Sequence, residues 1–174
     1  MDEMVEEELQ IQEERAKARH ISDAAFTRTI GEICERPANT LDITASIGDA
    51  IRSMRERRIG NVIITKDGKL HGIVTERDLM LKVAGNIQDV ELLPVTGIMT
   101  PDPECLMKRD TIAHLLNKMY IGGFRHMPIV DEEHRPLHTV SLRYILQYII
   151  AYLPDDIVNM PSEPFRGEAS RYGG

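Results

Sequence analysis

The fold is decided by Gly72-Ile73-Val74-Thr75-Glu76-Arg77-Asp78, where an apolar strand end runs directly into the start of a helix. Thr75 and Asp78 stand three residues apart before the apolar run 79–81, which is the spacing of an N-terminal capping box. Free backbone N–H groups and the helix dipole at such a start favour anions and hydroxyl groups. The stretch therefore predicts a strand–helix junction with the chemistry of a binding site.

This junction recurs 66 residues later as His138-Thr139-Val140-Ser141-Leu142-Arg143-Tyr144. The strand end, the hydroxyl and the arginine are kept, whereas Tyr144 replaces the acid. Residues 29–34 likewise match residues 94–99, so the likeness extends well upstream of the junction. A tandem repeat of one supersecondary unit follows from these matches.

Each copy reads strand, helix, strand, strand, helix. The expected strands are 40–43, 61–65 and 70–74 in the first copy and 105–108, 127–130 and 137–140 in the second; the helices start at Ser46, Thr75, Thr111 and Ser141. Gly60 and Gly122-Gly123 are expected to end the first helix of each copy, and Asp67-Gly68 predicts a tight hairpin.

One copy has too little apolar surface to fold alone. We therefore expect an α/β (α+β) fold in which two pseudo-symmetric β-α-β-β-α repeats pack sheet to sheet. The boundaries predicted from the pattern are an acidic N-terminal helix or arm over 1–28, a first repeat over 29–90, a second repeat over 91–153, and an extended or disordered tail over 154–174.

The composition is that of a soluble globular protein, with 42% apolar and 28% charged residues among 174. A net charge of −7 counts against nucleic acid or an anionic membrane as partner. Cys34 and Cys105 have no metal-ligand spacing, the N-terminus has no apolar signal core, and the apolar run 142–153 is too short to span a bilayer. We expect a cytoplasmic protein with no metal site.

The ordered set of repeated segments resembles a tandem pair of cystathionine β-synthase (CBS) domains, the Bateman module. The segments that carry the resemblance are Ile59-Gly60-Asn61-Val62-Ile63-Ile64, Gly72 to Asp78, Val95-Thr96-Gly97-Ile98-Met99 and Phe124-Arg125-His126-Met127-Pro128-Ile129-Val130. The resemblance implies a regulatory module that binds AMP, ADP or ATP in clefts between the repeats, needs no obligatory cofactor, forms dimers and acts on a further protein.

A nucleoside offers a cis-diol, a flat base and an anionic tail. Asp78 can accept two hydrogen bonds from the diol, Thr75 can donate one, and backbone groups beside Gly60 can reach the base edge. By the resemblance, the phosphates meet Arg125 and His126, with Arg77 nearby. The residues expected at this first cleft are Thr40, Gly60, Asn61, Val62, Thr75, Arg77, Asp78, Arg125 and His126.

Other interpretations of these residues remain open. Thr75 and Asp78 are also explained by capping alone, and Arg125 with His126 by a surface pair or a buried histidine. Arg55, Arg57 and Arg58 form a basic cluster whose first role is to complement a helix C-terminus. The second cleft, with Cys105, Met127, Pro128, Ser141 and Arg143, is expected to bind weakly or not at all, since Tyr144 replaces the acid and His138 the glycine.

The helix expected from Ser141 to Leu153 is apolar on almost every side, so part of it needs a cover beyond its own repeat. We therefore expect a homodimer packed through these C-terminal helices. No nucleophile elbow, phosphate loop or paired-histidine motif is present, so we expect no enzyme. Alternatives are a ligand-independent dimerisation adaptor and a binder of another adenosyl compound such as S-adenosylmethionine.

Overall fold

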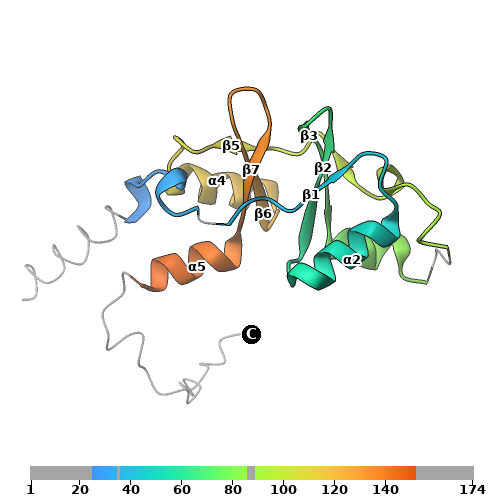
Figure 1. The fold of residues 1–174 in the computed structure, drawn as a ribbon. Helices are drawn as coiled ribbons and strands as arrows, with labels where there is room; N and C mark the ends of the chain where they lie inside the picture. The colour runs from blue at the N-terminus through green and yellow to red at the C-terminus, as the bar shows by residue number, and fades with distance from the viewer. Residues whose placement is uncertain (1–24, 35, 86–88, 152–174) are drawn as a thin grey trace, which may run out of the picture.

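The computed structural model describes residues 25–34, 36–85 and 89–151 as two small sheets standing side by side, each with its own helices (Figure 1). The first repeat comprises β1 (Thr40–Asp42), α2 (Ile47–Arg57), β2 (Asn61–Lys66), β3 (Lys69–Thr75), α3 (Glu76–Asp78) and the π-helix η2 (Leu79–Val83). The second comprises β5 (Leu106–Met107), α4 (Ile112–Gly122), β6 (His126–Val130), β7 (Pro136–Ser141) and α5 (Leu142–Ile150). The predicted α+β repeat is confirmed.

The helix starts and the hairpin follow the sequence signals. The Ser46 hydroxyl accepts from the Asp49 N–H at 3.1 Å, and the corresponding hydroxyl caps each of the three other predicted helix starts. Asp67 and Gly68 have φ of 52° and 75°, which is the left-handed pair that a two-residue hairpin turn requires. Gly123 ends α4 with φ 66°, as expected.

The prediction that Gly60 ends α2 is wrong. Arg58 takes the left-handed conformation at the end of this helix, with φ 53°. Gly60 lies two residues further on, where its carbonyl accepts from the Glu76 N–H at 3.1 Å. A Cβ at Gly60 would lie 3.0 Å from the Glu76 carboxyl carbon, so a larger residue here would require this exposed side chain to move.

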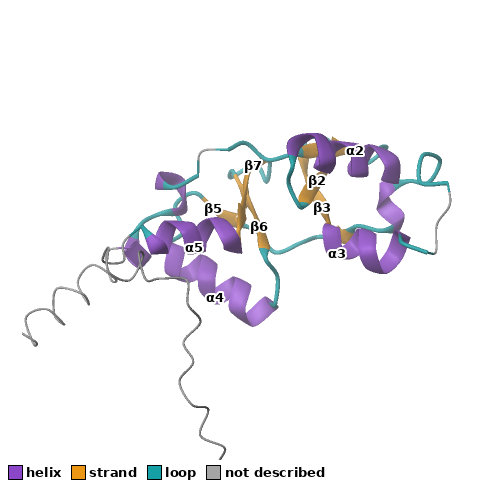
Figure 2. Cartoon of the chain, turned by 90° about the horizontal axis from the view of Figure 1, so that it is seen from below, coloured by secondary structure: helices purple, strands orange, loops and turns teal. Residues whose placement is uncertain are grey.

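The two sheets share a three-strand pattern, to which the first adds a fourth strand. In the first, β1 runs parallel to β2, β2 antiparallel to β3, and the short strand β4 (Thr100–Pro101) adds to the edge of β3. In the second, β5 runs parallel to β6 and β6 antiparallel to β7. Helices α4 and α5 lie against the second sheet (Figure 2), where Ile112, Leu115 and Ile145 belong to one buried core.

A short helical turn and the residues after it precede each repeat and are called its lead-in segment here. Each lead-in segment packs against the other repeat. The turn η1 (Ile30–Glu32) precedes the first repeat, yet Ile30 is buried in the core of the second. The turn η3 (Val95–Gly97) precedes the second repeat, yet Val95 is buried in the core of the first. The next residues cross in the same way, since Pro37 pairs with His138 of β7 as Pro101 pairs with Gly72 of β3. The sequence shows that these two segments match each other but does not reveal the exchange, because their apolar residues suit either core.

The two sheets pack face to face through a small apolar cluster. Ile63 and Ile73 of the first sheet are buried with Val130 of the second. The Leu70 N–H also donates to the His134 carbonyl at 2.9 Å, which joins the two hairpins. This contact fixes the repeats relative to one another, so the ends of β2 and β6 face a shared space.

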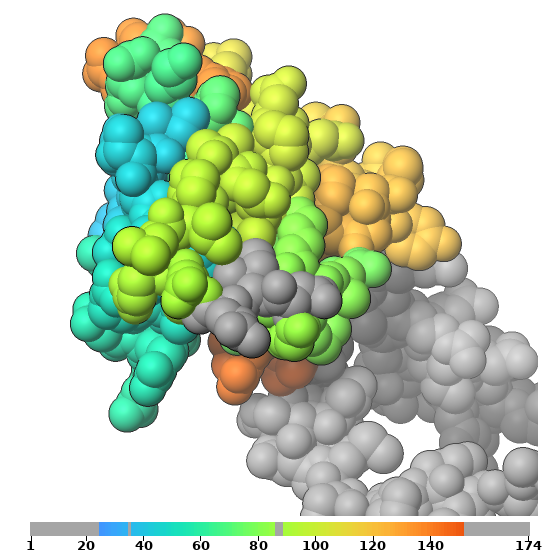
Figure 3. All heavy atoms as spheres, turned by 90° about the vertical axis from the view of Figure 1, so that its right-hand side faces the viewer, coloured from blue at the N-terminus to red at the C-terminus, as the bar shows by residue number. Residues whose placement is uncertain are grey.

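The connector between the repeats is tied to α2. The Ile47 N–H donates to the Leu93 carbonyl at 2.9 Å, and Arg52 Nη1 lies 2.5 Å from Glu91 Oε1. In Figure 3 residues around 90–100, in yellow-green, lie over this end of the molecule.

Within the described ranges no helix is long and apolar enough to cross a bilayer. Most of the predicted N-terminal arm and the whole of the 154–174 tail lie outside those ranges.

Candidate ligand cavity between the repeats

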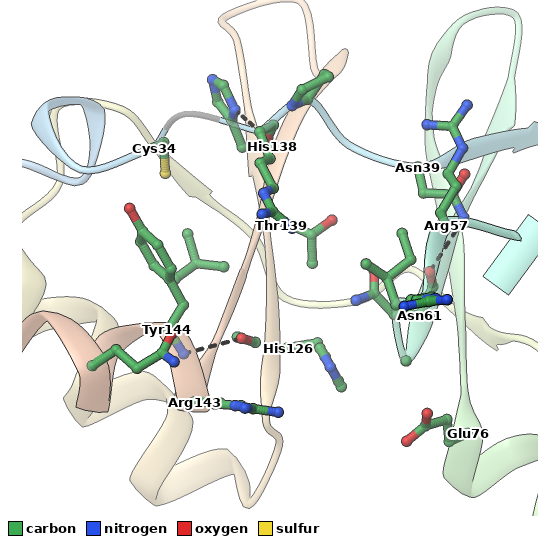
Figure 4. Close-up of a pocket in the computed structure, with 18 residues that line it drawn as sticks. Cys34, Asn39, Arg57, Asn61, Glu76, His126, His138, Thr139, Arg143 and Tyr144 are labelled. Carbon is green, nitrogen blue, oxygen red and sulfur yellow. Dashed lines mark hydrogen bonds between the residues drawn. The ribbon is translucent and has the colours of Figure 1, made fainter. Parts of the chain in front are cut away.

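A cavity of about 800 Å³ opens between the two repeats, within the size range of sites for small ligands (Figure 4). Its wall from the first repeat includes Arg57, Asn61 and Glu76, at the end of α2 and the ends of β2 and β3. Its wall from the second includes His126 and Thr139 on β6 and β7. The remaining lining residues are Cys34, Arg36, Pro37, Asn39, Arg58, Ile59, Gly60, His138, Val140, Ser141, Arg143, Tyr144 and Gln147.

Two buried oxygen atoms in this wall have no hydrogen-bond partner among the described residues. They are Oδ1 of Asn61, whose residue is only 6% exposed, and Oγ1 of Thr139. An unsatisfied buried polar atom costs about 1–3 kcal/mol, so a partner within the cavity is favoured. The backbone at Asn61 is itself well supported, because Asn39 Nδ2 donates to its carbonyl at 3.4 Å and Ser53 Oγ donates to Asn39 Oδ1 at 2.8 Å.

The cavity is strongly basic. Among the residues that the structure describes, it is lined by four arginines, Arg36, Arg57, Arg58 and Arg143, and by one carboxylate, that of Glu76. Within the described ranges none of these arginines forms an ion pair. Unpaired guanidinium groups suit phosphate, whose oxygens they bind two at a time. The cavity therefore favours an anionic ligand.

His126 contributes a different chemistry from the arginines. Burial lowers the pKa of this histidine, the Glu76 carboxylate opposes the change, and Arg125 adds to it. The imidazole is consequently neutral at pH 7 and offers one donor and one acceptor. It can contact a sugar or a base, but it adds no positive charge.

The second repeat holds the lead-in segment of the first repeat, which forms one wall of the cavity. Tyr144 donates a hydrogen bond from its hydroxyl to the Ile33 carbonyl, and His138 Nδ1 donates to the Arg36 carbonyl at 2.7 Å. Cys34 lies beside them, and burial raises the pKa of its thiol to about 11. Tyr144 thus has a structural role at the position where the first repeat has Asp78.

The cavity combines residues that the sequence assigned to different clefts. Gly60, Asn61 and His126 were expected at the first cleft and Ser141 and Arg143 at the second, and all five line this cavity. Since it contains Ser141 and Tyr144, it is the second cleft, which was expected to be the weaker. The other predicted residues do not line it: Thr40, Arg77 and Arg125 are exposed; Val62, Met127 and Pro128 are buried; Thr75, Asp78 and Cys105 are partly buried.

At the first cleft, Thr75 and Asp78 form the predicted capping box. Asp78 Oδ2 accepts from the Thr75 N–H at 2.9 Å and from its hydroxyl at 2.7 Å, and Oδ1 lies 2.9 Å from Lys82 Nζ. Burial raises the pKa of Asp78, but the hydrogen bonds from Lys82 and Thr75 outweigh it and hold the pKa below its ordinary value. The role of this carboxylate as a ribose acceptor stays a prediction.

Several lining residues were not predicted as site residues. Arg57 and Arg58 were recognised only as a helix-end cluster, although that cluster is the signal that points to them. Arg36 reaches the cavity because the lead-in segment crosses to the second repeat, whereas Asn39 is held on the first repeat, where its carbonyl accepts from the Ile63 N–H at 2.8 Å. Thr139 lies within an apolar strand pattern, and no sequence signal separates it from its neighbours.

Comparison with known proteins supports the repeat assignment. The CBS-domain family profile matches residues 30–85 and 95–151. The CBS domain-containing protein CBSCBSPB3 of Arabidopsis thaliana is 33% identical over 120 residues, which is 63% of this chain and 22% of that protein. This chain therefore spans only about a fifth of that relative's length.

Two solved structures share the fold at low identity. The CBS domain pair of protein MJ0100, in complex with 5′-methylthioadenosine and S-adenosyl-L-methionine, has a TM-score of 0.66 at 23% identity, covering 73% of this chain and 99% of its own. CBS domain protein PAE2072 from Pyrobaculum aerophilum, complexed with AMP, has a TM-score of 0.63 at 22% identity. The match covers 71% of this chain and 98% of that protein. With two profile matches over most of its length and this shared architecture, the chain belongs to the CBS-domain family as a tandem domain pair.

Proposed function

We propose that this CBS pair is a regulatory module that binds an adenosine nucleotide in the cavity between its repeats. The observation that carries the proposal is Asn61 Oδ1, a buried acceptor without a partner among the described residues, on a side chain that lines a basic cavity. An amino group on a purine is a suitable donor to this atom, and the arginines are suitable partners for phosphate. The proposal is also supported by MJ0100 and PAE2072, whose bound ligands all contain adenosine.

Ligand binding is coupled to shape through the walls of the cavity. One wall carries Asn61 and Glu76 of the first repeat, and the other carries Thr139 and Arg143 of the second. A ligand that touches both walls binds best at one particular relative orientation of the repeats, and so shifts the population toward it. A regulated partner protein that contacts both repeats would sense this shift.

The charge of the cavity distinguishes between adenosyl ligands. S-adenosylmethionine carries a sulfonium cation, which the four lining arginines repel and which, among the described lining residues, Glu76 alone attracts. AMP, ADP and ATP carry anionic tails that the same arginines bind. We therefore expect this cavity to bind the nucleotides more tightly than S-adenosylmethionine.

The first cleft is retained as a second proposed site. Thr75 and Asp78 have the positions expected of ribose partners at a helix start, but Lys82 already neutralises the carboxylate. A diol would have to share Asp78 Oδ1 with this lysine. Binding at the first cleft is accordingly proposed to be the weaker of the two, the reverse of the order expected from sequence.

Self-association through α5 is proposed alongside ligand binding. Of this apolar helix only Ile145 is fully buried, while Leu146 is 51% and Ile150 45% exposed. A second copy of α5 would cover these side chains in an isologous contact. The same observation favours the alternative function, a dimerisation adaptor that needs no ligand.

Calorimetric titration of the full chain with AMP and with ATP tests the proposal. We expect saturable binding of at least one nucleotide, weakened about tenfold or more by Asn61→Leu, a change of similar volume that removes the acceptor. Asn117→Leu, on the exposed face of α4, is the matched control and should bind normally. No heat with either nucleotide, together with an unchanged Tm, would reject ligand binding and favour the adaptor.

A further inference from the structure

The arginines of the cavity come from both of its sides. Figure 4 shows Arg57 on the side of the first repeat and Arg143 on the side of the second, with Thr139 and Asn61 between them. Arg58 lies next to Arg57 in sequence, and Arg36 lies on the lead-in segment held by His138. Positive charge is therefore spread across the width of the cavity rather than gathered at one phosphate position.

On the basis of the proposed function, we infer that this cavity selects nucleotides with two or three phosphates over the monophosphate, and that it binds them without a divalent cation. A single phosphate carries about two negative charges at neutral pH, and each further phosphate in a chain adds about one. A single phosphate is compact, whereas a di- or triphosphate chain is long enough to extend toward arginines on both walls. A longer chain therefore gains contacts that AMP lacks.

The lining also disfavours a magnesium complex. Mg²⁺ in nucleotide sites is usually held by one or two protein carboxylates in addition to the phosphates. Here Glu76 is the one carboxylate among the described lining residues, and the described ranges contain no group of three His, Cys, Asp or Glu residues able to hold a metal. A bound Mg²⁺ would cancel the phosphate charge to which the arginines are attracted. The guanidinium groups take the place of the metal.

The test is calorimetry of AMP, ADP and ATP binding to the full chain, each with EDTA and with excess Mg²⁺. We expect ATP and ADP to bind at least about tenfold more tightly than AMP in EDTA, and Mg²⁺ to weaken ATP while leaving AMP unchanged. Arg57→Ala and Arg143→Ala should each weaken ATP about tenfold and AMP less than threefold. The control is Arg55→Ala, because Arg55 is an exposed arginine of α2, the helix that carries Arg57, and does not line the cavity.

The outcomes separate this inference from the function on which it rests. Equal affinities for AMP and ATP, both lost in Asn61→Leu, would overturn the phosphate preference and keep the nucleotide site. Tighter binding of ATP with Mg²⁺ than with EDTA would overturn the metal-free mode. No binding of any nucleotide would reject the proposed function itself.

Discussion

Lys82 Nζ lies 2.9 Å from Asp78 Oδ1, so the carboxylate expected to hold a ribose already has a cationic partner. The same lysine donates to the Ile98 carbonyl at 2.5 Å, which ties α3 to the turn that follows the connector. Asp78 Oδ2 is engaged by Thr75 in the capping box. This carboxylate is thus part of the framework of the first repeat, whatever ligand it also meets.

Asp78→Ala separates capping from ligand binding. Loss of the cap should lower the free energy of unfolding by about 0.5–2 kcal/mol, measured by denaturant titration. We expect the weaker nucleotide site at the first cleft to be lost, and the affinity of the cavity to stay within about twofold. Asp78→Asn, which keeps the shape without the charge, is the control for size. If both variants bind nucleotide as the wild type does at every site, Asp78 is only a cap.

Acid should destabilise the protein through its first repeat. Hydrogen bonds from Ser46 and Arg52 lower the pKa of Asp49 to about 2, and Asp78 also has a lowered pKa. Carboxylates with a pKa lowered on folding stabilise the folded state above about pH 4, and this contribution disappears as the pH falls toward 2. Unfolding free energies measured from pH 6 to pH 2.5 should therefore fall less steeply in Asp49→Asn. An unchanged slope would contradict the assignment.

The second cleft should tolerate a deoxyribose. Tyr144 stands where an acid would hold the diol, and its hydroxyl bonds the Ile33 carbonyl. We expect 2′-deoxy-ATP to bind the wild-type cavity within about twofold of ATP, and Tyr144→Asp to favour ATP by about tenfold. Tyr144→Phe controls for loss of the hydroxyl. Strong discrimination between ATP and 2′-deoxy-ATP by the wild type would show that another side chain binds the diol.

Cys34 should report occupancy of the cavity. Burial raises its pKa from 9.0 to about 11, so its thiolate is about a hundredfold scarcer at pH 8 than that of an ordinary thiol. Alkylation followed by peptide mass spectrometry should be slow at Cys34 and slower still with saturating ATP. Cys105, whose pKa burial also raises, does not line the cavity and should show no protection. Equal protection of both thiols would point to a global change instead.

Charged substitutions on α5 test the proposed dimer. Leu146→Glu and Ile150→Glu each place a carboxylate on the exposed apolar face, where an isologous contact would have to bury it. We expect both variants to be monomers by light scattering at concentrations where the wild type is a dimer. Leu92→Glu, in the connector and 82% exposed, is the control. A wild-type monomer, or dimers that survive both changes, would contradict this interface.

Local signals account for most of what the sequence predicted correctly. The Ser46–Asp49 and Thr75–Asp78 spacings set helix starts, and Asp67-Gly68 sets a hairpin, because each depends on residues close in the chain. Repetition of these signals then gave the two-repeat architecture. Each was confirmed in the structure.

Longer-range relationships could not be predicted in the same way. An apolar turn such as η1 fits the core of either repeat, so its crossing to the second repeat is decided by packing alone. That crossing brings Arg36 into the cavity, while Asn39 and Asn61 line it from the first repeat. The site is therefore composed of residues from both predicted clefts, which a comparison of the two copies in sequence keeps apart.

Nucleotide binding between the repeats is best tested by a crystal structure of the full chain grown with saturating ATP and EDTA. We expect a nucleotide within the cavity, with a donor group of the base or sugar on Asn61 Oδ1 and phosphate oxygens on arginines of both repeats. A cavity that holds only water under these conditions, or a nucleotide bound solely beside Asp78, would contradict it.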